Sequence, residues 1–268
     1  MDLRVRIAGR SDMGMKRKNN EDSMFFSEED GLCVVADGMG GLEAGEVASG
    51  MAVELLSKQV IFASPTEVLY DGKPDVLATM GKFAHLFGDW LRRTNSMIYD
   101  RHLQDPLRRK MGTTIAILFV RGDYGIVANV GDARIYRARN EKLAQLSHDH
   151  SWVEELSRMQ GVQVDPNVLS KYKNIVTRAL GVGEAVQPDI QIQKLQAGDI
   201  FLLCSDGLSN MVSDLEMESI LLNAENDLER GVDFLIDMAN HRGGLDNITV
   251  ILGLVEEVKE EAGADGTK

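Results

Sequence analysis

Hydrophobic and polar positions along the chain follow two periods, one typical of strands and one typical of helices. Leu3, Val5 and Ile7 alternate with charged residues, which predicts a half-exposed strand near the N-terminus. A shorter strand is predicted at "SMFFS", and a hairpin at "ARIYRA" and "LAQL". Apolar runs predict buried strands at "GLCVVAD", "MGTTIAILFV", "IVANV", "DIFLLCSD" and "DNITVILGLV".

Apolar residues at helical spacing predict two long helices, over residues 44–62 and about 75–102. "DHSWVEELSRM" predicts a short helix with Asp149 or Ser151 near its N-cap. Two further amphipathic helices are predicted near residues 213–222 and 225–241.

The order of these elements indicates the fold class. Strands come in consecutive hairpin-like pairs, and the helices come in pairs between them. This order favours an α+β fold with antiparallel sheets over a doubly wound parallel sheet. No linker divides the 268 residues, and a hydrophobic content of 44% supplies a sizeable core.

Composition excludes several classes of protein. No apolar run approaches the roughly 20 residues that span a bilayer, and the N-terminus has no apolar signal-peptide region. We therefore expect a cytoplasmic protein without a membrane partner. The net charge of −13 argues against nucleic-acid partners. Cys33 and Cys204 lie in apolar runs and are predicted to be buried and unpaired.

Four aspartates stand beside the predicted buried strands. Asp37 and Asp206 end such strands, Asp132 follows one, and Asp246 precedes one. A single Asp-Gly is ordinary turn chemistry. Several carboxylates at strand ends, however, are costly to bury unless they converge on cations. Oxygen ligands select hard metals, namely magnesium, manganese or calcium. Together the four favour a metal site.

Other chemistry has weaker support. The "HDH" triplet that holds His148 and His150 could bind a metal, but a polar triplet before a helix is more often a cap and loop. The chain has no zinc motif, no P-loop, no G-x-S-x-G and no dinucleotide fingerprint.

Nine short segments in chain order resemble one family. They are "RKNNEDS", "VVADGMGG", "GEVAS", "MGTT", "NVGDARIYR", "LSHDHS", "IVTRALG", "LLCSDGLSNMV" and "DNITVIL". Their wording and order resemble the bacterial metal-dependent protein serine/threonine phosphatases of type 2C. The resemblance runs from about residue 5 to 255. It is weak over residues 63–110 and 160–174.

The resemblance implies a fold that patterning alone does not reach. The family is a four-layer αββα sandwich of two antiparallel sheets flanked by helix pairs, with metals in a cleft at one end. It implies a catalytic domain over residues 1–256 and a flap beside the cleft at about 155–180. Residues 257–268 are acidic and rich in glycine and alanine, and we expect a disordered tail there.

The resemblance also implies metal ligands where the motifs match. Asp37 resembles the carboxylate that bridges two metals, with the Gly38 carbonyl as a further ligand. Asp206 and Asp246 resemble ligands of the first metal. The implied cofactors are two or three Mn²⁺ or Mg²⁺ ions.

Four further roles follow from the same comparison of motifs. Glu21 and Asp22 match the acidic pair that serves the second metal, directly or through water. Asp132 matches the aspartate that holds a third, weaker metal together with Asp206. Arg17 matches the arginine that binds the substrate phosphate. An exposed loop that serves only solubility is the alternative for Arg17.

The implied chemistry needs no covalent phosphoenzyme. Two divalent ions lower the pKa of a bridging water. The resulting hydroxide would attack phosphorus in line with the leaving alcohol, while Arg17 meets the phosphoryl oxygens bidentately.

Met39 departs from the family pattern. Some members, notably eukaryotic ones, have a histidine there that has been assigned as the general acid. Methionine cannot donate a proton, so we hypothesise that no side chain serves as general acid in this chain.

The sequence therefore predicts an enzyme that removes phosphate from phosphoserine and phosphothreonine on proteins and reverses Ser/Thr kinase signalling. Its expected partners are phosphorylated proteins, including a Ser/Thr kinase and its targets, and it is expected to be a monomer. One alternative is a phosphatase dedicated to a single anti-sigma antagonist. Another is an inactive relative that only binds phosphoproteins. The intact set of Asp37, Asp206, Asp246 and Arg17 argues against the inactive relative.

Overall fold

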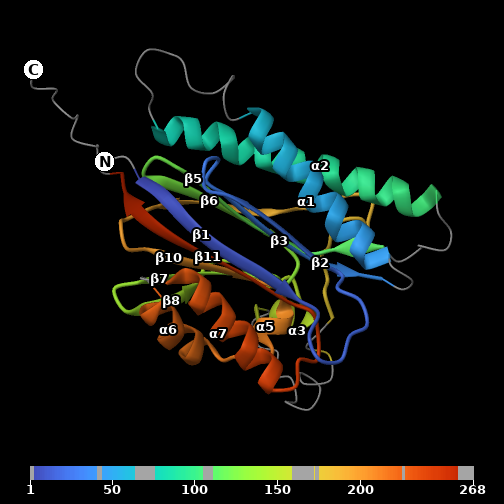
Figure 1. The fold of residues 1–268 in the computed structure, drawn as a ribbon. Coiled ribbons are helices and arrows are strands. Elements are labelled where there is room, and N and C mark those ends of the chain that lie inside the picture. Colours follow the sequence, from blue (N-terminus) through green and yellow to red (C-terminus); the bar gives the residue numbers. More distant parts are fainter. Residues whose placement is uncertain are drawn as a thin grey trace, which may run out of the picture.

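The computed structural model describes residues 3–40, 44–63, 76–104, 111–158, 172, 175–224 and 227–258. Two antiparallel sheets pack face to face, and a pair of helices covers the outer face of each sheet (Figure 1). The predicted α+β class and the implied αββα sandwich are thus confirmed.

The first sheet has five strands in the order β1-β11-β10-β7-β8. These are β1 (Leu3–Asp12), β11 (Ile248–Glu257), β10 (Ile200–Cys204), β7 (Arg134–Arg139) and β8 (Lys142–Gln145). All of its neighbouring strands are antiparallel. The first and the last strand of the described chain therefore pair along their whole length.

The second sheet has the order β2-β3-β5-β6-β9, and β4 pairs with the end of β3. Its strands are β2 (Asp22–Ser27), β3 (Leu32–Met39), β4 (Gly112–Thr113), β5 (Ile115–Arg121), β6 (Tyr124–Val130) and β9 (Asp189–Lys194). The sequence pattern did not predict β9, whose six residues include only two apolar ones and which has no buried residue.

The long helices match the predicted periodic segments. α1 (Ala44–Ala63) and α2 (Val76–Gln104) cover the second sheet, whereas α6 (Asp214–Asn223) and α7 (Leu228–His241) cover the first (Figure 1). Asp227 caps α7 by accepting a hydrogen bond from the Arg230 N–H at 3.0 Å. Two short helices, α3 (Trp152–Arg158) and α5 (Asp206–Ser209), lie in connections.

Each sheet is apolar on both faces, which explains the unbroken apolar runs. In β3, Leu32, Val34 and Ala36 pack under α1 and α2, while Cys33 and Val35 face the other sheet. β10 divides in the same way between the helix layer and the layer between the sheets. A strand covered on both faces has no polar face to alternate with. The odd-numbered residues of β3 therefore point toward the first sheet.

Several predictions about the remaining segments can be compared with the structure. Both cysteines are buried and free, as predicted. β11 continues to Glu257, one residue past the predicted domain boundary. Nearly all of the predicted tail, and much of the predicted flap at 155–180, lie outside the described residues. Of the helices described, none combines the length and apolar content that a membrane crossing requires.

Phe119 fixes α2 to the second sheet. Its ring centroid lies 5.0 Å from that of Phe83 and 5.5 Å from that of Phe87. We predict that Phe119→Ala lowers the free energy of unfolding by about 3–5 kcal/mol, because it leaves a cavity under the helix. Chemical denaturation measures this, with Leu215→Ala on an exposed position of α6 as control. Equal stability of the two variants would contradict the assigned packing.

Candidate active site

A cleft of about 350 Å³ brings together seven of the eight residues that the sequence singled out. Met39, Gly40, Thr114 and Val176 complete its lining. The seven residues are Arg17, Glu21, Asp37, Gly38, Asp132, Asp206 and Asp246.

A larger hollow of about 550 Å³ opens between α6 and α7 on the outer surface. It is lined by one carboxylate, Asp227, and one guanidinium, Arg230, among mostly uncharged residues. Size alone would favour this hollow. The convergence of ionisable groups favours the smaller cleft, and we take that cleft as the candidate active site.

Asp37 lies near the end of β3 and is held by the segment around β4. The Asp37 N–H donates to the Thr114 hydroxyl at 3.2 Å, and the Thr114 N–H donates to the Asp37 carbonyl at 2.8 Å. The Thr113 hydroxyl donates to the same carbonyl at 2.9 Å. The "MGTT" motif therefore fixes the backbone of Asp37, a role that the sequence reasoning did not assign.

The glycines beside the aspartates make room for the chain itself. A Cβ on Gly38 would lie 2.2 Å from the Gly45 carbonyl oxygen and 2.4 Å from the Glu21 carbonyl oxygen. A Cβ on Gly207 would lie 1.9 Å from the Asn247 carbonyl oxygen. Close backbone approach therefore requires glycine at both positions.

Glu21 and Asp22 are adjacent in sequence but occupy different environments. Glu21 lines the cleft. Asp22 is only 8% exposed, and its Oδ2 accepts hydrogen bonds from the Ser205 hydroxyl at 2.8 Å and the Thr249 hydroxyl at 2.6 Å. Asp22 is also the direct register partner of Asp37. Asp22 therefore lies behind the cleft lining, where it contacts Ser205 and Thr249.

Burial and mutual repulsion raise the pKa values of the carboxyl groups. Burial raises the pKa of Asp37 well above its ordinary value, and the neighbouring aspartates, Asp22 first, raise it further. Burial, followed by repulsion from Asp206, raises the pKa of Asp132 to about 7. The pKa of Asp206 is raised by burial and then by Asp246. Such a cluster would hold protons near neutral pH unless a cation joins it.

A hard divalent cation fits this donor set, because every acidic group in the cleft offers oxygen ligands. Among the described residues, no group of three or more His, Cys, Asp or Glu side chains is arranged closely enough to hold a metal ion. Asp246 is engaged by Arg17, whose Nη2 donates to its Oδ2 at 2.6 Å. The Oδ1 of Asp246 accepts the Asn247 N–H at 2.9 Å, and the remaining lone pairs of the carboxylate leave room for a cation.

Asn247 ties the loops of the cleft together, and the sequence reasoning missed it. Its Oδ1 accepts the Glu21 N–H at 2.9 Å, and its Nδ2 donates to the carbonyls of Met13 at 2.9 Å and Asn19 at 3.0 Å. The signal was present as the second letter of "DN". One amide thus holds both ends of the loop that carries Arg17.

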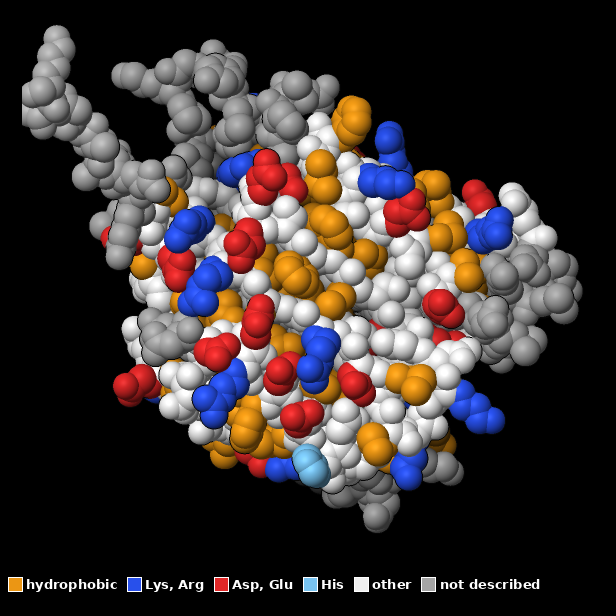
Figure 2. Space-filling view, viewed as in Figure 1, with side chains coloured by type: hydrophobic (Ala, Val, Ile, Leu, Met, Phe, Trp, Pro, Cys, Tyr) orange, Lys and Arg blue, Asp and Glu red, His pale blue; other side chains and the backbone are white. Residues whose placement is uncertain are grey.

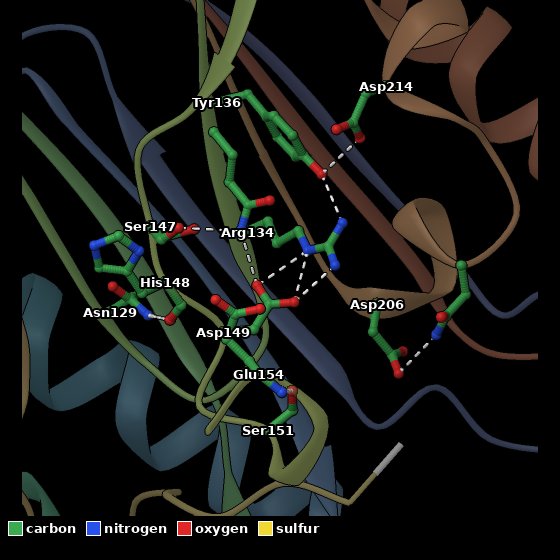
Figure 3. A network of polar contacts seen from close by, with 12 residues as sticks. Asn129, Arg134, Tyr136, Ser147, His148, Asp149, Ser151, Glu154, Asp206 and Asp214 are labelled. Atoms are coloured by element: carbon green, nitrogen blue, oxygen red, sulfur yellow. Dashed lines mark hydrogen bonds and ion pairs between the residues drawn. The ribbon is translucent and has the colours of Figure 1, made fainter. Parts of the chain in front are cut away.

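Arg134 organises the wall beside Asp132 (Figure 3). Its guanidinium donates to both carboxylate oxygens of Asp149, with Nη2 to Oδ2 at 2.7 Å. Its Nη1 donates to the Tyr136 hydroxyl at 2.9 Å, which donates to Asp214 at 3.2 Å. The "HDH" aspartate therefore binds an arginine. Of the two N-cap candidates for α3, Ser151 makes the capping contact, since its hydroxyl accepts the Glu154 N–H at 3.3 Å.

His150 is fully buried behind the Asp132 loop. Its Nδ1 accepts the Gly131 N–H at 3.1 Å, so the neutral ring carries its proton on Nε2. Nε2 lies 3.3 Å from Asp189 Oδ2, outside good hydrogen-bond geometry. Burial, followed by repulsion from Arg178, lowers the pKa of His150. His150 thus supports the backbone next to Asp132 in its neutral form.

We predict that His150→Phe lowers the free energy of unfolding by roughly 1–3 kcal/mol at pH 7.5, because the Gly131 N–H loses its acceptor. The lowered folded pKa means that the stabilisation is fully present above the unfolded pKa of about 6.5 and is lost as pH falls toward the folded pKa. The stability difference between the two proteins should therefore narrow from pH 7.5 to 5.5. Paired denaturation curves test this, and a difference that widens would contradict the neutral form assigned to His150.

Comparisons with known proteins agree with the fold. The family model described as "Protein phosphatase 2C" matches residues 13–246. The serine/threonine phosphatase Stp of Listeria monocytogenes is 38% identical over 267 residues, which cover 96% of this chain and 98% of that protein.

Solved structures extend the similarity to three dimensions. The Mycobacterium tuberculosis serine/threonine phosphatase PstP/Ppp is 32% identical with a TM-score of 0.79, covering 95% of this chain and 100% of that one. The catalytic domain of PstP in complex with two manganese ions is 34% identical with a TM-score of 0.76, at the same coverage. The extent of these matches, in sequence and in fold, shows that the chain belongs to the protein phosphatase 2C family.

Proposed function

We propose that this protein hydrolyses phosphoserine and phosphothreonine esters on proteins and depends on two or three Mn²⁺ or Mg²⁺ ions. The observation that carries the proposal is the cleft itself, where acidic oxygen donors converge beside one arginine. The manganese-bound PstP relative supports the choice of metal. Removal of phosphate would reverse the action of a Ser/Thr kinase, so that kinase and its targets are the proposed partners.

The residues that would hold the metals are the acidic groups of the cleft. Asp37, Asp206 and Asp246 are proposed as the principal ligands, with the Gly38 carbonyl, Glu21 and Asp132 at the periphery. When bound, such ions act as Lewis acids and lower the pKa of coordinated water toward neutrality. The chain orients its ligands through Thr113 and Thr114 at Asp37, and the Asn210 amide donates to Asp206 at 3.1 Å.

Arg17 is proposed to bind the substrate phosphate. Its side chain reaches the cleft from an exposed loop, and its guanidinium now donates to Asp246. A phosphate dianion offers the same paired oxygens as a carboxylate, with more charge. Arg17 would therefore bind the substrate phosphate beside Asp246.

No histidine among the described residues lines the cleft. His148 lies in a separate small hollow with Arg134 and Asp149, and the Nδ1 of His150 is occupied by Gly131. Met39 stands in the cleft wall. The hypothesis that no side chain acts as general acid is consistent with this placement.

An inactive phosphoprotein-binding relative is the principal alternative. The first experiment measures phosphate release from a phosphothreonine peptide with manganese, with magnesium and with chelator. Release that requires metal supports the enzyme. Folded protein that binds the peptide but releases no phosphate under any metal would support the alternative and overturn the proposal.

We predict that Asp206→Asn abolishes metal-dependent phosphate release and leaves the fold intact. The loss should exceed the roughly 10–100-fold effect of removing an outer-shell partner, because a direct ligand is lost. Steady-state kinetics at saturating manganese measure this. Asp233→Asn, which alters an exposed carboxylate of α7 paired with Arg10, is the matched control and should keep full activity. Unchanged turnover in Asp206→Asn would refute the ligand assignment.

We predict that His148→Ala changes phosphopeptide hydrolysis by less than about twofold, because the side chain lies outside the cleft. An aryl phosphate, whose leaving group needs no acid, provides the comparison. If His148→Ala abolished hydrolysis of the phosphopeptide and spared that of the aryl phosphate, His148 would be the general acid and the hypothesis about Met39 would fail.

A further inference from the structure

Three large apolar side chains stand exposed beside the cleft. Met13 is 44% exposed, Met15 66% and Leu245 56%. We call these three residues the apolar rim. Single exposed apolar residues are common on protein surfaces and need no explanation. These three, however, lie on two loops that touch each other and that continue directly into Arg17 and Asp246 of the cleft.

The loops of the apolar rim are tied firmly together. The N–H groups of Met15 and Lys16 both donate to the Gly244 carbonyl, at 2.8 and 3.2 Å. The Asn247 amide donates to the Met13 carbonyl at 2.9 Å. Exposed methionines on a fixed backbone form a preorganised contact surface, which binds at lower entropic cost than a loose loop.

Two glycines show how closely the loops meet. Gly14 has a φ of +76°, and a Cβ there would lie 2.1 Å from the Asp246 carbonyl oxygen. Gly244 has a φ of +50°, and a Cβ there would lie 2.8 Å from the Met15 side chain. Both positions therefore require glycine for conformation and for space. The backbone of the two loops is therefore tightly packed at Gly14 and Gly244, whereas the side chains of Met13 and Met15 are exposed to solvent.

The charge around the apolar rim opposes the charge of the whole protein. Lys16 and Lys18 are exposed, and neither forms an ion pair with any described residue. The chain as a whole carries a net charge of −13. Figure 2 shows hydrophobic and basic side chains, set apart from one another, at the lower right, near where the β1–β2 loop of Figure 1 leaves the sandwich. This corner would attract an acidic segment that the rest of the surface repels.

We propose that the apolar rim, flanked by Lys16 and Lys18, binds the residues next to the phosphorylated side chain of a protein substrate. It would select a large apolar residue within an acidic stretch. Methionine side chains adapt to apolar partners of different shape, which suits an enzyme with several substrates. This inference rests on the proposed function and names the substrate class of the same site.

The test compares two phosphothreonine peptides of equal net negative charge, one with leucines flanking the phosphothreonine and one with serines there. Wild-type protein with manganese should favour the leucine peptide by roughly tenfold in kcat/KM, because at least one apolar side chain is buried on binding. The variant Met13→Ser/Met15→Ser/Leu245→Ser should lose this preference. Hydrolysis of p-nitrophenyl phosphate, which is too small to reach the rim, should change by less than about twofold.

Phe62→Ser is the matched control. Phe62 is 87% exposed near the far end of α1, about 26 Å along the helix from Gly45, which touches Gly38. The Phe62→Ser variant should keep the preference for the leucine peptide over the serine peptide. The rim inference is overturned if the wild type releases phosphate from both peptides at equal kcat/KM. It is also overturned if the triple variant keeps the preference for the leucine peptide. If the wild type releases no phosphate from any peptide, the proposed function itself fails.

A second variant tests the basic flank. Lys16→Gln/Lys18→Gln should lower kcat/KM for the acidic leucine peptide by roughly two- to fivefold at low salt, and about 0.5 M salt should remove the difference. A neutral leucine peptide should be unaffected. Equal losses on acidic and neutral peptides would overturn the assigned charge preference.

Discussion

Mutual repulsion between buried carboxylates is the constraint on which this end of the sandwich depends. The β2–β3 register sets Asp22 directly opposite Asp37, and like charges in that position destabilise a sheet. The strands form nevertheless, because hydroxyls of Ser205 and Thr249 from the other sheet donate to Asp22. The second sheet therefore carries its acidic pair only where the first sheet lies against it. This links the packing of the sandwich to the electrostatics of the cleft.

Loops at the strand ends turn this pair of strands into a site. Only Ser205 separates the end of β10 from Asp206, which begins α5, and Gly207 lets the Asn247 backbone pass within contact distance. Asn247 then holds the loop that brings Arg17 to Asp246. Each cleft residue thus stands on backbone that another segment fixes. A preorganised array of donors is what catalysis by charge stabilisation requires.

The sequence could predict those parts of the site where an apolar run stops at a carboxylate. Asp37 and Asp206 satisfy that pattern, and the resemblance supplied Arg17 and Glu21. It could not predict that Asp22 lies beneath the cleft, because the face that a strand residue takes depends on the register of the strand. Nor could it find Asn247 and His150, whose roles come from contacts with residues at least 19 positions away. β9 escaped prediction because edge strands lack a strong apolar pattern.

The proposed phosphate-binding residue and the apolar rim share one structural support. Asn247 holds the loop that presents both Met13 and Arg17, and Gly244 receives the hydrogen bonds from Met15 and Lys16. An apolar residue seated on the rim would therefore bear on the same loop that positions the guanidinium. Because hydrogen bonds already fix that loop, the position of Arg17 is set before the substrate arrives. Contacts of the flanking sequence with the rim would then lower KM and leave kcat unchanged, since they are equally strong in the ground state and in the transition state.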